Sequence, residues 1–298
     1  MMFKKITIIL LLVGLAVTGS YLFIRHRRDQ QIFRQRKAEW CELEKSVKQD
    51  VNRFNQECGI VIKDLKYGWE ITVNEDKLFP SASMVKVPIM ASIVLASRQG
   101  KLKLEDTVVL KNKDKAYGSG VLKEYAQGSR FNIDDLIELM ITQSDNTAAN
   151  MLIDYMGFDN LNSYFKKFGL NNTNLARKMM DFKSRDQGIE NFTSARDLAN
   201  LLEKIYRHKL ASRQSSQICL DILKKQKIRD RIPRRLPSGT VVANKTGLER
   251  NICHDAGIVF TPQGDFLICV LTRHQYQYAR PAKIFISRLA REVYNCYQ

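Results

Sequence analysis

A long stretch of helical periodicity lies between two groups of strand-like segments, and this order restricts the fold more than any other feature of the sequence. Over about residues 83–208, apolar side chains recur with spacings of three and four, which predicts helices. Apolar segments bounded by turn residues predict strands on both sides of this stretch. The predicted strands are residues 59–65, 70–73, 239–244, 256–261 and 265–272.

Helices are predicted within this stretch and at both ends of the folded region. We therefore expect an α/β (α+β) fold: a five-stranded antiparallel sheet flanked by terminal helices, plus an all-α subdomain over about residues 83–208. A cleft between the two parts is the natural place for a site. The predicted helices are residues 30–56, 85–102, 133–143, 146–155, 159–168, 194–207 and 282–297.

Residues 6–24 form an uncharged apolar run of about the length needed to cross a bilayer. The run is longer than the core of a typical cleavable signal, so an uncleaved transmembrane anchor is favoured over a signal peptide. Basic residues are more numerous after the run than before it, and the positive-inside rule alone would keep the rest of the chain in the cytoplasm. The predicted parts are a tail (1–5), the anchor (6–24), a juxtamembrane helical spacer (25–45) and one folded domain (46–298).

The chain has 298 residues, with 48 Lys and Arg against 31 Asp and Glu, and a net charge of +17. Its composition is that of a globular protein and excludes disordered and low-complexity classes. No nucleic-acid-binding signature accompanies the charge, so the basic surface is either simply solvated or attracted to an anionic envelope. None of the six cysteines lies in a metal-binding pattern, and we expect a monomer without metal or other cofactor.

The first chemical motif, Ser83-Met84-Val85-Lys86, opens a predicted helix. Residues three apart share a helical face, so the Lys86 amine can approach the Ser83 hydroxyl. A serine nucleophile needs a nearby base, and a lysine can serve when burial and another cation favour its neutral form. By itself this pattern is common in chains of this length.

The second motif, Ser144-Asp145-Asn146, lies in a short break between predicted helices. Ser144 can relay a proton to a leaving nitrogen, and the Asn146 amide can hold a substrate carbonyl. The competing interpretation is an N-cap for the helix that begins near Asn146.

The third motif, Lys245-Thr246-Gly247, ends the predicted strand 239–244. A strand beside the first motif would place Lys245 near the second motif and Thr246 near a substrate carboxylate. Gly247 permits close approach to the backbone, and the Leu248 N–H is placed to join the Ser83 N–H in an oxyanion hole.

The three motifs occur in the order described for penicillin-recognising serine enzymes. Over about residues 46–298 the chain resembles class A β-lactamases and related serine hydrolases, and the Asp of the second motif favours class A. Residues 118–122, 193–199 and 231–237 match the family further. The resemblance implies that Ser83 is acylated, that Lys86 is its base or proton relay, and that Ser144 protonates the leaving nitrogen. The implied substrate contacts are Asn146, Lys245, Thr246, Gly247 and Leu248.

One position departs from the family pattern. The class A Ω loop reads Arg-x-Glu-x-x-Leu-Asn, and its Glu activates the water that hydrolyses the acyl-enzyme. Arg177 fits the arginine, but Met179 stands where the Glu is expected, and a thioether cannot take a proton. Asp181 and Glu190 are the nearest carboxylates, and each either substitutes for the Glu or forms a loop salt bridge. Loss of such a base commonly costs a factor of about 10² to 10⁴.

Four further residues have open assignments. Tyr117 is placed either as an aromatic wall of the cleft or as packing within the helical subdomain. Arg250 is either a contact for the substrate carboxylate or a loop charge. In the resembling fold the first and last helices pack together, which implies a possible disulfide between Cys41 and Cys296 in an oxidising compartment.

The sequence therefore predicts a serine hydrolase that cleaves the β-lactam amide. The first alternative is a penicillin-binding D-alanyl peptidase, or another amide or ester hydrolase, that is acylated and deacylates slowly. The second alternative is a non-catalytic, membrane-tethered sensor domain. The expected location is the cell membrane, with the catalytic domain on the periplasmic or extracellular side, because long domains can cross despite flanking charges and this chemistry requires the outside.

Overall fold

The computed structural model describes residues 2–298, with side chains for residues 14–15 and 18–298. The chain divides into two compact units, Met1–Val47 and Lys48–Gln298. Helix α1 (Met2–Phe54) runs through the first unit and ends in the second. The predicted anchor is part of this helix, and most of its side chains lie outside the described residues. No helix in the described part of the chain is both long enough and apolar enough to cross a membrane.

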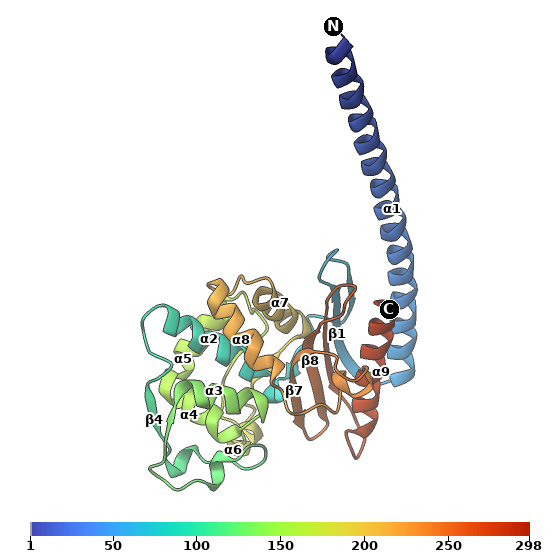
Figure 1. Cartoon of the computed structure of the whole chain (residues 1–298). Coiled ribbons are helices and arrows are strands. Elements are labelled where there is room, and N and C mark those ends of the chain that lie inside the picture. The colour runs from blue at the N-terminus through green and yellow to red at the C-terminus, as the bar shows by residue number, and fades with distance from the viewer. Residues whose placement is uncertain (1) are drawn as a thin grey trace. The chain divides into compact units, whose positions relative to one another are not determined.

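The second unit contains the predicted five-stranded antiparallel sheet, in the order β2-β1-β9-β8-β7. Strands β1, β8 and β9 are buried almost throughout, because most of their residues are apolar. Figure 1 shows α9 (Arg280–Asn295) on one side of the sheet and the helical region, including α7 (Ala195–Tyr206), on the other. The strands are β1 (Glu57–Asp64), β2 (Glu70–Val73), β7 (Val242–Glu249), β8 (Ile252–Val259) and β9 (Phe266–Arg273).

The helical region surrounds α2, which is buried along most of its length and therefore forms the centre of that region's core. Two small two-stranded sheets, β3 (Phe79–Pro80) with β6 (Phe192–Thr193) and β4 (Thr107–Val109) with β5 (Arg130–Asn132), brace its edges. Its helices are α2 (Lys86–Arg98), α3 (Ile133–Thr142), α4 (Asn146–Met156), α5 (Phe158–Lys167), α6 (Phe182–Asp186) and α8 (Arg213–Lys224). The 3₁₀ turns are η1 (Ala82–Val85), η2 (Asn112–Asp114), η3 (Leu122–Glu124) and η4 (Ile232–Arg235).

Among the boundaries that differ from the sequence prediction, two concern the end of the helical region and the strand of the third motif. Helix α8 lies beyond the predicted limit of the helical region; its buried face includes serines and Cys219, so its apolar stripe is narrow. The strand predicted at residues 239–244 is β7 (Val242–Glu249), because pairing with β8 continues to Glu249 opposite Ile252. Lys245, Thr246 and Gly247 therefore lie inside the strand instead of at its end.

The possible disulfide between Cys41 and Cys296 is not formed, and none of the six cysteines is part of a disulfide. The Cys296 thiol instead donates to the Glu292 carbonyl one helical turn earlier, at 3.8 Å. Cys58 and Cys269 lie on the neighbouring strands β1 and β9, opposite Thr272 and Val61 respectively, and both are buried free thiols.

Candidate active site

Ser83 lies in η1, directly before α2, and is partly exposed, whereas Lys86 is completely buried. Ala82, the residue before Ser83, has φ +45°, a left-handed conformation that is unfavourable for alanine. The Ser83 side chain makes no hydrogen bond to another residue in the described part of the chain. The serine is therefore held at the start of the helix by its backbone and has its hydroxyl available.

The ammonium groups of Lys86 and Lys245 meet at Ser144. Lys245 Nζ donates to Ser144 Oγ at 3.0 Å, and Lys86 Nζ lies 3.3 Å from the same oxygen and 2.7 Å from the Ser144 carbonyl. Ser144 itself has φ +57°, so it occupies a turn conformation between α3 and α4. The three sequence motifs are thus brought together by α2, the α3–α4 turn and β7.

Asn146 connects Lys86 to the loop at residues 117–122. Its Oδ1 accepts from Lys86 Nζ at 2.8 Å, and its Nδ2 donates to the Tyr117 carbonyl at 2.8 Å. The Asn146 backbone N–H also donates to the Ser119 carbonyl. In this structure the amide fixes the position of Lys86 and of the loop, and a substrate amide would have to replace part of this bonding.

Asp145 is the residue that caps α4. Its carboxylate accepts from the Ala148 N–H at 2.9 Å and from the N–H groups of Val121 and Leu122 at 2.7 and 2.9 Å. The N-cap interpretation of the second motif is therefore right for Asp145. Ser144 and Asn146, on either side of it, contact the lysines.

Burial makes both lysines easier to deprotonate. Burial lowers the pKa of Lys86 to about 7, although the charges of Asp145 and Glu249 act in the opposite direction. Burial, followed by the charges of Lys86 and Arg231, holds the pKa of Lys245 well below its ordinary value. An amine with a pKa near 7 can accept a proton from a serine hydroxyl at neutral pH.

Strand β7 lies directly against η1. A Cβ added at Gly247 would come 3.2 Å from Met84 Cγ and 3.4 Å from Ala82 Cβ, so a side chain there would push the strand away from the nucleophile. Thr246 is buried, and Leu248 is about half exposed, at 49%. Behind the strand, Asp255 accepts from Asn244 Nδ2 at 2.9 Å, and burial raises the pKa of Asp255 to about 6.

Tyr117 and Arg250 are both exposed at the surface. Tyr117 is 85% exposed, so it does not pack within the helical region. Arg250 lies in the turn between β7 and β8 and forms no ion pair with any described residue. Both side chains are available to a ligand, and neither is held against the two lysines.

Met179 is fixed beside the second motif by Asn150, one helical turn after Asn146 on α4. Asn150 Oδ1 accepts from the Met179 N–H at 2.8 Å, and Asn150 Nδ2 donates to the Met179 carbonyl at 3.2 Å. The Met179 side chain is 6% exposed. The α5–β6 loop (residues 168–191) therefore presents a buried thioether at this position.

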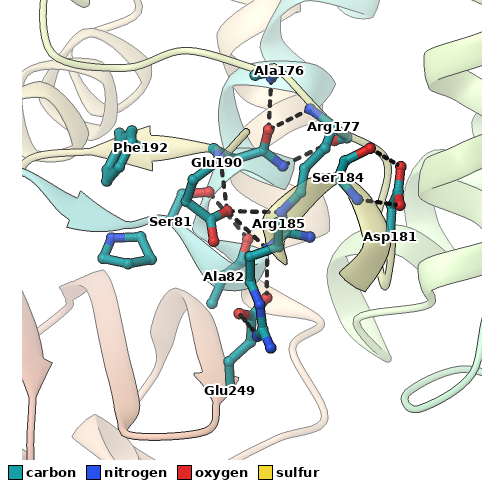
Figure 2. A network of polar contacts seen from close by, with 12 residues as sticks. Ser81, Ala82, Ala176, Arg177, Asp181, Ser184, Arg185, Glu190, Phe192 and Glu249 are labelled. Carbon is teal, nitrogen blue, oxygen red and sulfur yellow. Dashed lines mark hydrogen bonds and ion pairs between the residues drawn. The ribbon is translucent and has the colours of Figure 1, made fainter. Parts of the chain in front are cut away.

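The carboxylates of this loop are engaged elsewhere. Asp181 caps α6 by accepting from the Ser184 N–H and hydroxyl at 3.0 and 2.7 Å. Glu190 accepts from Arg177 Nε and pairs with Arg177 Nη2, at 2.9 and 2.7 Å (Figure 2). The interpretation of Glu190 as a loop salt bridge is confirmed, and Asp181 has a structural role as a helix cap.

Sequence reasoning missed Glu249. Its carboxylate lies 3.6 Å from Arg177 Nη2 and 3.8 Å from Arg185 Nη1. Side chains alternate between the two faces of a strand, so residues 245, 247 and 249 lie on one face of β7. The signal that could have found Glu249 is this two-residue repeat, which applies once the third motif is known to lie inside the strand. Among the described residues, no group of three His, Cys, Asp or Glu side chains is arranged to hold a metal ion.

Comparison with known proteins gives a consistent result. The model of the beta-lactamase enzyme family matches residues 42–297. The extended-spectrum beta-lactamase PER-1 of Pseudomonas aeruginosa is 27% identical over 241 residues, 76% of this chain and 77% of its own length. The structure of a PBP-A mutant in an acyl-enzyme complex with penicillin G is 31% identical with a TM-score of 0.79, covering 86% of this chain and 96% of that one. A beta-lactamase structure from Sphaerobacter thermophilus is also 31% identical, with a TM-score of 0.78 over 84% and 95% of the two chains.

Proposed function

The chain belongs to the beta-lactamase enzyme family, and we propose that it hydrolyses the amide bond of β-lactams through an acyl-enzyme on Ser83. The observation that carries this proposal is the meeting of Lys86 and Lys245 at Ser144 Oγ, beside Ser83, whose hydroxyl makes no hydrogen bond to another described residue. A nucleophile, a base with a pKa near 7 and a proton relay are the three groups that acyl transfer requires.

In the acylation step, neutral Lys86 would take the proton of Ser83 as Oγ attacks the β-lactam carbonyl carbon. The C–N bond of the ring then breaks, and Ser144 would give its proton to the leaving nitrogen while receiving one from a lysine hydrogen-bonded to it. The N–H groups of Ser83 and Leu248 would stabilise the oxyanion. Lys245 and Thr246 would bind the substrate carboxylate, and Asn146 its side-chain amide.

Time-resolved intact mass spectrometry with a penicillin, read beside nitrocefin turnover, tests this function. We expect the mass of the protein to rise by that of the whole penicillin and then to return to its original value as product accumulates. An adduct that persists without turnover would contradict hydrolysis and indicate a penicillin-binding enzyme. Absence of any adduct would contradict the assignment of a serine acyl-transfer site and favour a sensor domain.

We further propose that residues 6–24 anchor a monomeric protein in the cell membrane, with its catalytic domain outside. The length and lack of charge of this run support the proposal. Cys41, which follows the run and is exposed, provides a test. A membrane-impermeant maleimide should label Cys41 in intact spheroplasts, whereas labelling that requires lysis would contradict the outward orientation.

A further inference from the structure

Hydrolysis of an acyl-enzyme needs a base for water, and the α5–β6 loop does not offer one. Met179 cannot accept a proton, Asp181 is used as a helix cap, and Glu190 is paired with Arg177. Asp145 already accepts three backbone N–H groups. The proposed function therefore depends on a carboxylate from another element.

Glu249 is such a carboxylate, and it lies on the face of β7 that is turned to the site. Strand alternation puts it on the same face as Lys245, whose ammonium reaches Ser144, and as Gly247, which packs against Ala82. Glu249 follows Gly247 by two residues, about 6.7 Å along the strand. Its carboxylate is close enough to Lys86 for its charge to raise the pKa of that lysine.

The contacts of Glu249 keep its carboxylate oriented without using all of its hydrogen-bonding capacity. Arg177 and Arg185 face it from the α5–β6 loop at 3.6 and 3.8 Å, distances too long for strong hydrogen bonds (Figure 2). Burial raises the pKa of Glu249, the two arginines act in the opposite direction, and the charge of Glu190 adds to the rise. A partly buried carboxylate with a raised pKa is a stronger base than an exposed one.

We propose that Glu249 activates the water that deacylates Ser83, so that the general base is supplied by strand β7 in place of the loop. Glu249 accepts one proton from water as the water oxygen bonds to the acyl carbonyl carbon. The bond between that carbon and Ser83 Oγ then breaks, the proton returns to Ser83 Oγ, and the hydrolysed product leaves with a carboxylic acid. This inference rests on the proposed β-lactam hydrolysis.

The test is Glu249→Gln in the full chain, with acylation and deacylation measured separately by intact mass. We expect acylation to stay within a few-fold of wild type and deacylation to slow by about 10² to 10⁴. The wild-type deacylation rate should fall on acidification, as Glu249 is protonated, and E249Q should lack this acid limb.

Glu190→Gln is the matched control, because Glu190 pairs with the same Arg177 but comes from the loop. It should deacylate much faster than E249Q. Equal slowing of deacylation in both variants would overturn the proposal, because it would show that Glu249 only holds the loop. An unchanged deacylation rate in E249Q would overturn it as well. In both cases the proposed β-lactam hydrolysis itself would stand. A wild-type protein that is acylated but never deacylates would overturn both the base and hydrolysis, while leaving Ser83 as the nucleophile.

Discussion

Lys86 and Lys245 approach the same oxygen, Ser144 Oγ, at 3.3 and 3.0 Å, from a helix and a strand that are 159 positions apart in the sequence. Two buried ammonium groups at one hydroxyl repel each other, so the arrangement favours the loss of a proton from one of them. Ser144 then has a donor on one side and a base on the other. This geometry allows the serine to pass a proton in either direction during acyl transfer.

Ser83→Ala should abolish covalent labelling by β-lactams, because no other hydroxyl lies at the start of α2 with Lys86 one turn away. Intact mass after incubation with a penicillin provides the measurement. Ser81→Ala is the control: Ser81 is two residues earlier, is fully buried, and its hydroxyl donates to the Ala82 carbonyl. Labelling of S83A at the wild-type rate would rule out Ser83 as the nucleophile.

Acylation should become faster as pH rises through about 7. Burial lowers the pKa of Lys86 to about 7, so the neutral amine that accepts the serine proton is lost below that pH. The rate should fall about tenfold for each unit below pH 7 and level off above it, as measured by the early rate of adduct formation. Lys86→Arg keeps the charge throughout this range and should remove acylation. A flat profile between pH 5 and 8 would exclude Lys86 as the base.

Asp145→Ala should lower the free energy of unfolding by about 2–4 kcal/mol, because it removes the cap of α4 and leaves the N–H groups of Val121 and Leu122 without their acceptor. Urea denaturation measures the loss. Asp135→Asn is the control: Asp135 is exposed in the first turn of α3, where a charge contributes within about 1 kcal/mol. Equal destabilisation of the two variants would contradict the role of Asp145 as the link between the helix and the 117–122 loop.

The fold and the three motifs could be predicted because each depends on short-range patterns. Apolar segments bounded by turn residues indicated the strands, and the types and spacing of Ser83, Lys86 and Ser144 indicated their chemistry. The position of Glu249 could not be predicted, because it depends on where pairing with β8 ends, and that is set by the opposite residue Ile252. The absence of the Cys41–Cys296 bridge likewise depends on the three-dimensional placement of two thiols, which spacing does not encode.

Met179→Glu should speed deacylation while leaving acylation nearly unchanged. Asn150 binds the backbone of residue 179 on both sides, so the loop should keep its conformation when the side chain changes. A carboxylate at this buried position, held by a residue one helical turn from Asn146, adds a second base at the site. The measurement is the decay rate of the penicillin adduct by intact mass.

Met180→Glu is the control for this change, because Met180 is adjacent in sequence but has φ +63°, lies beside Gly118, and is not the residue whose backbone Asn150 binds. It should not speed deacylation.

The most informative variant combines Met179→Glu with Glu249→Gln. If the loop position can supply the base that β7 supplies in the wild type, the double variant should deacylate faster than E249Q alone. A double variant as slow as E249Q would show that a carboxylate at position 179 does not reach the acyl carbonyl, and that the α5–β6 loop has lost more than one side chain of the family's hydrolytic machinery.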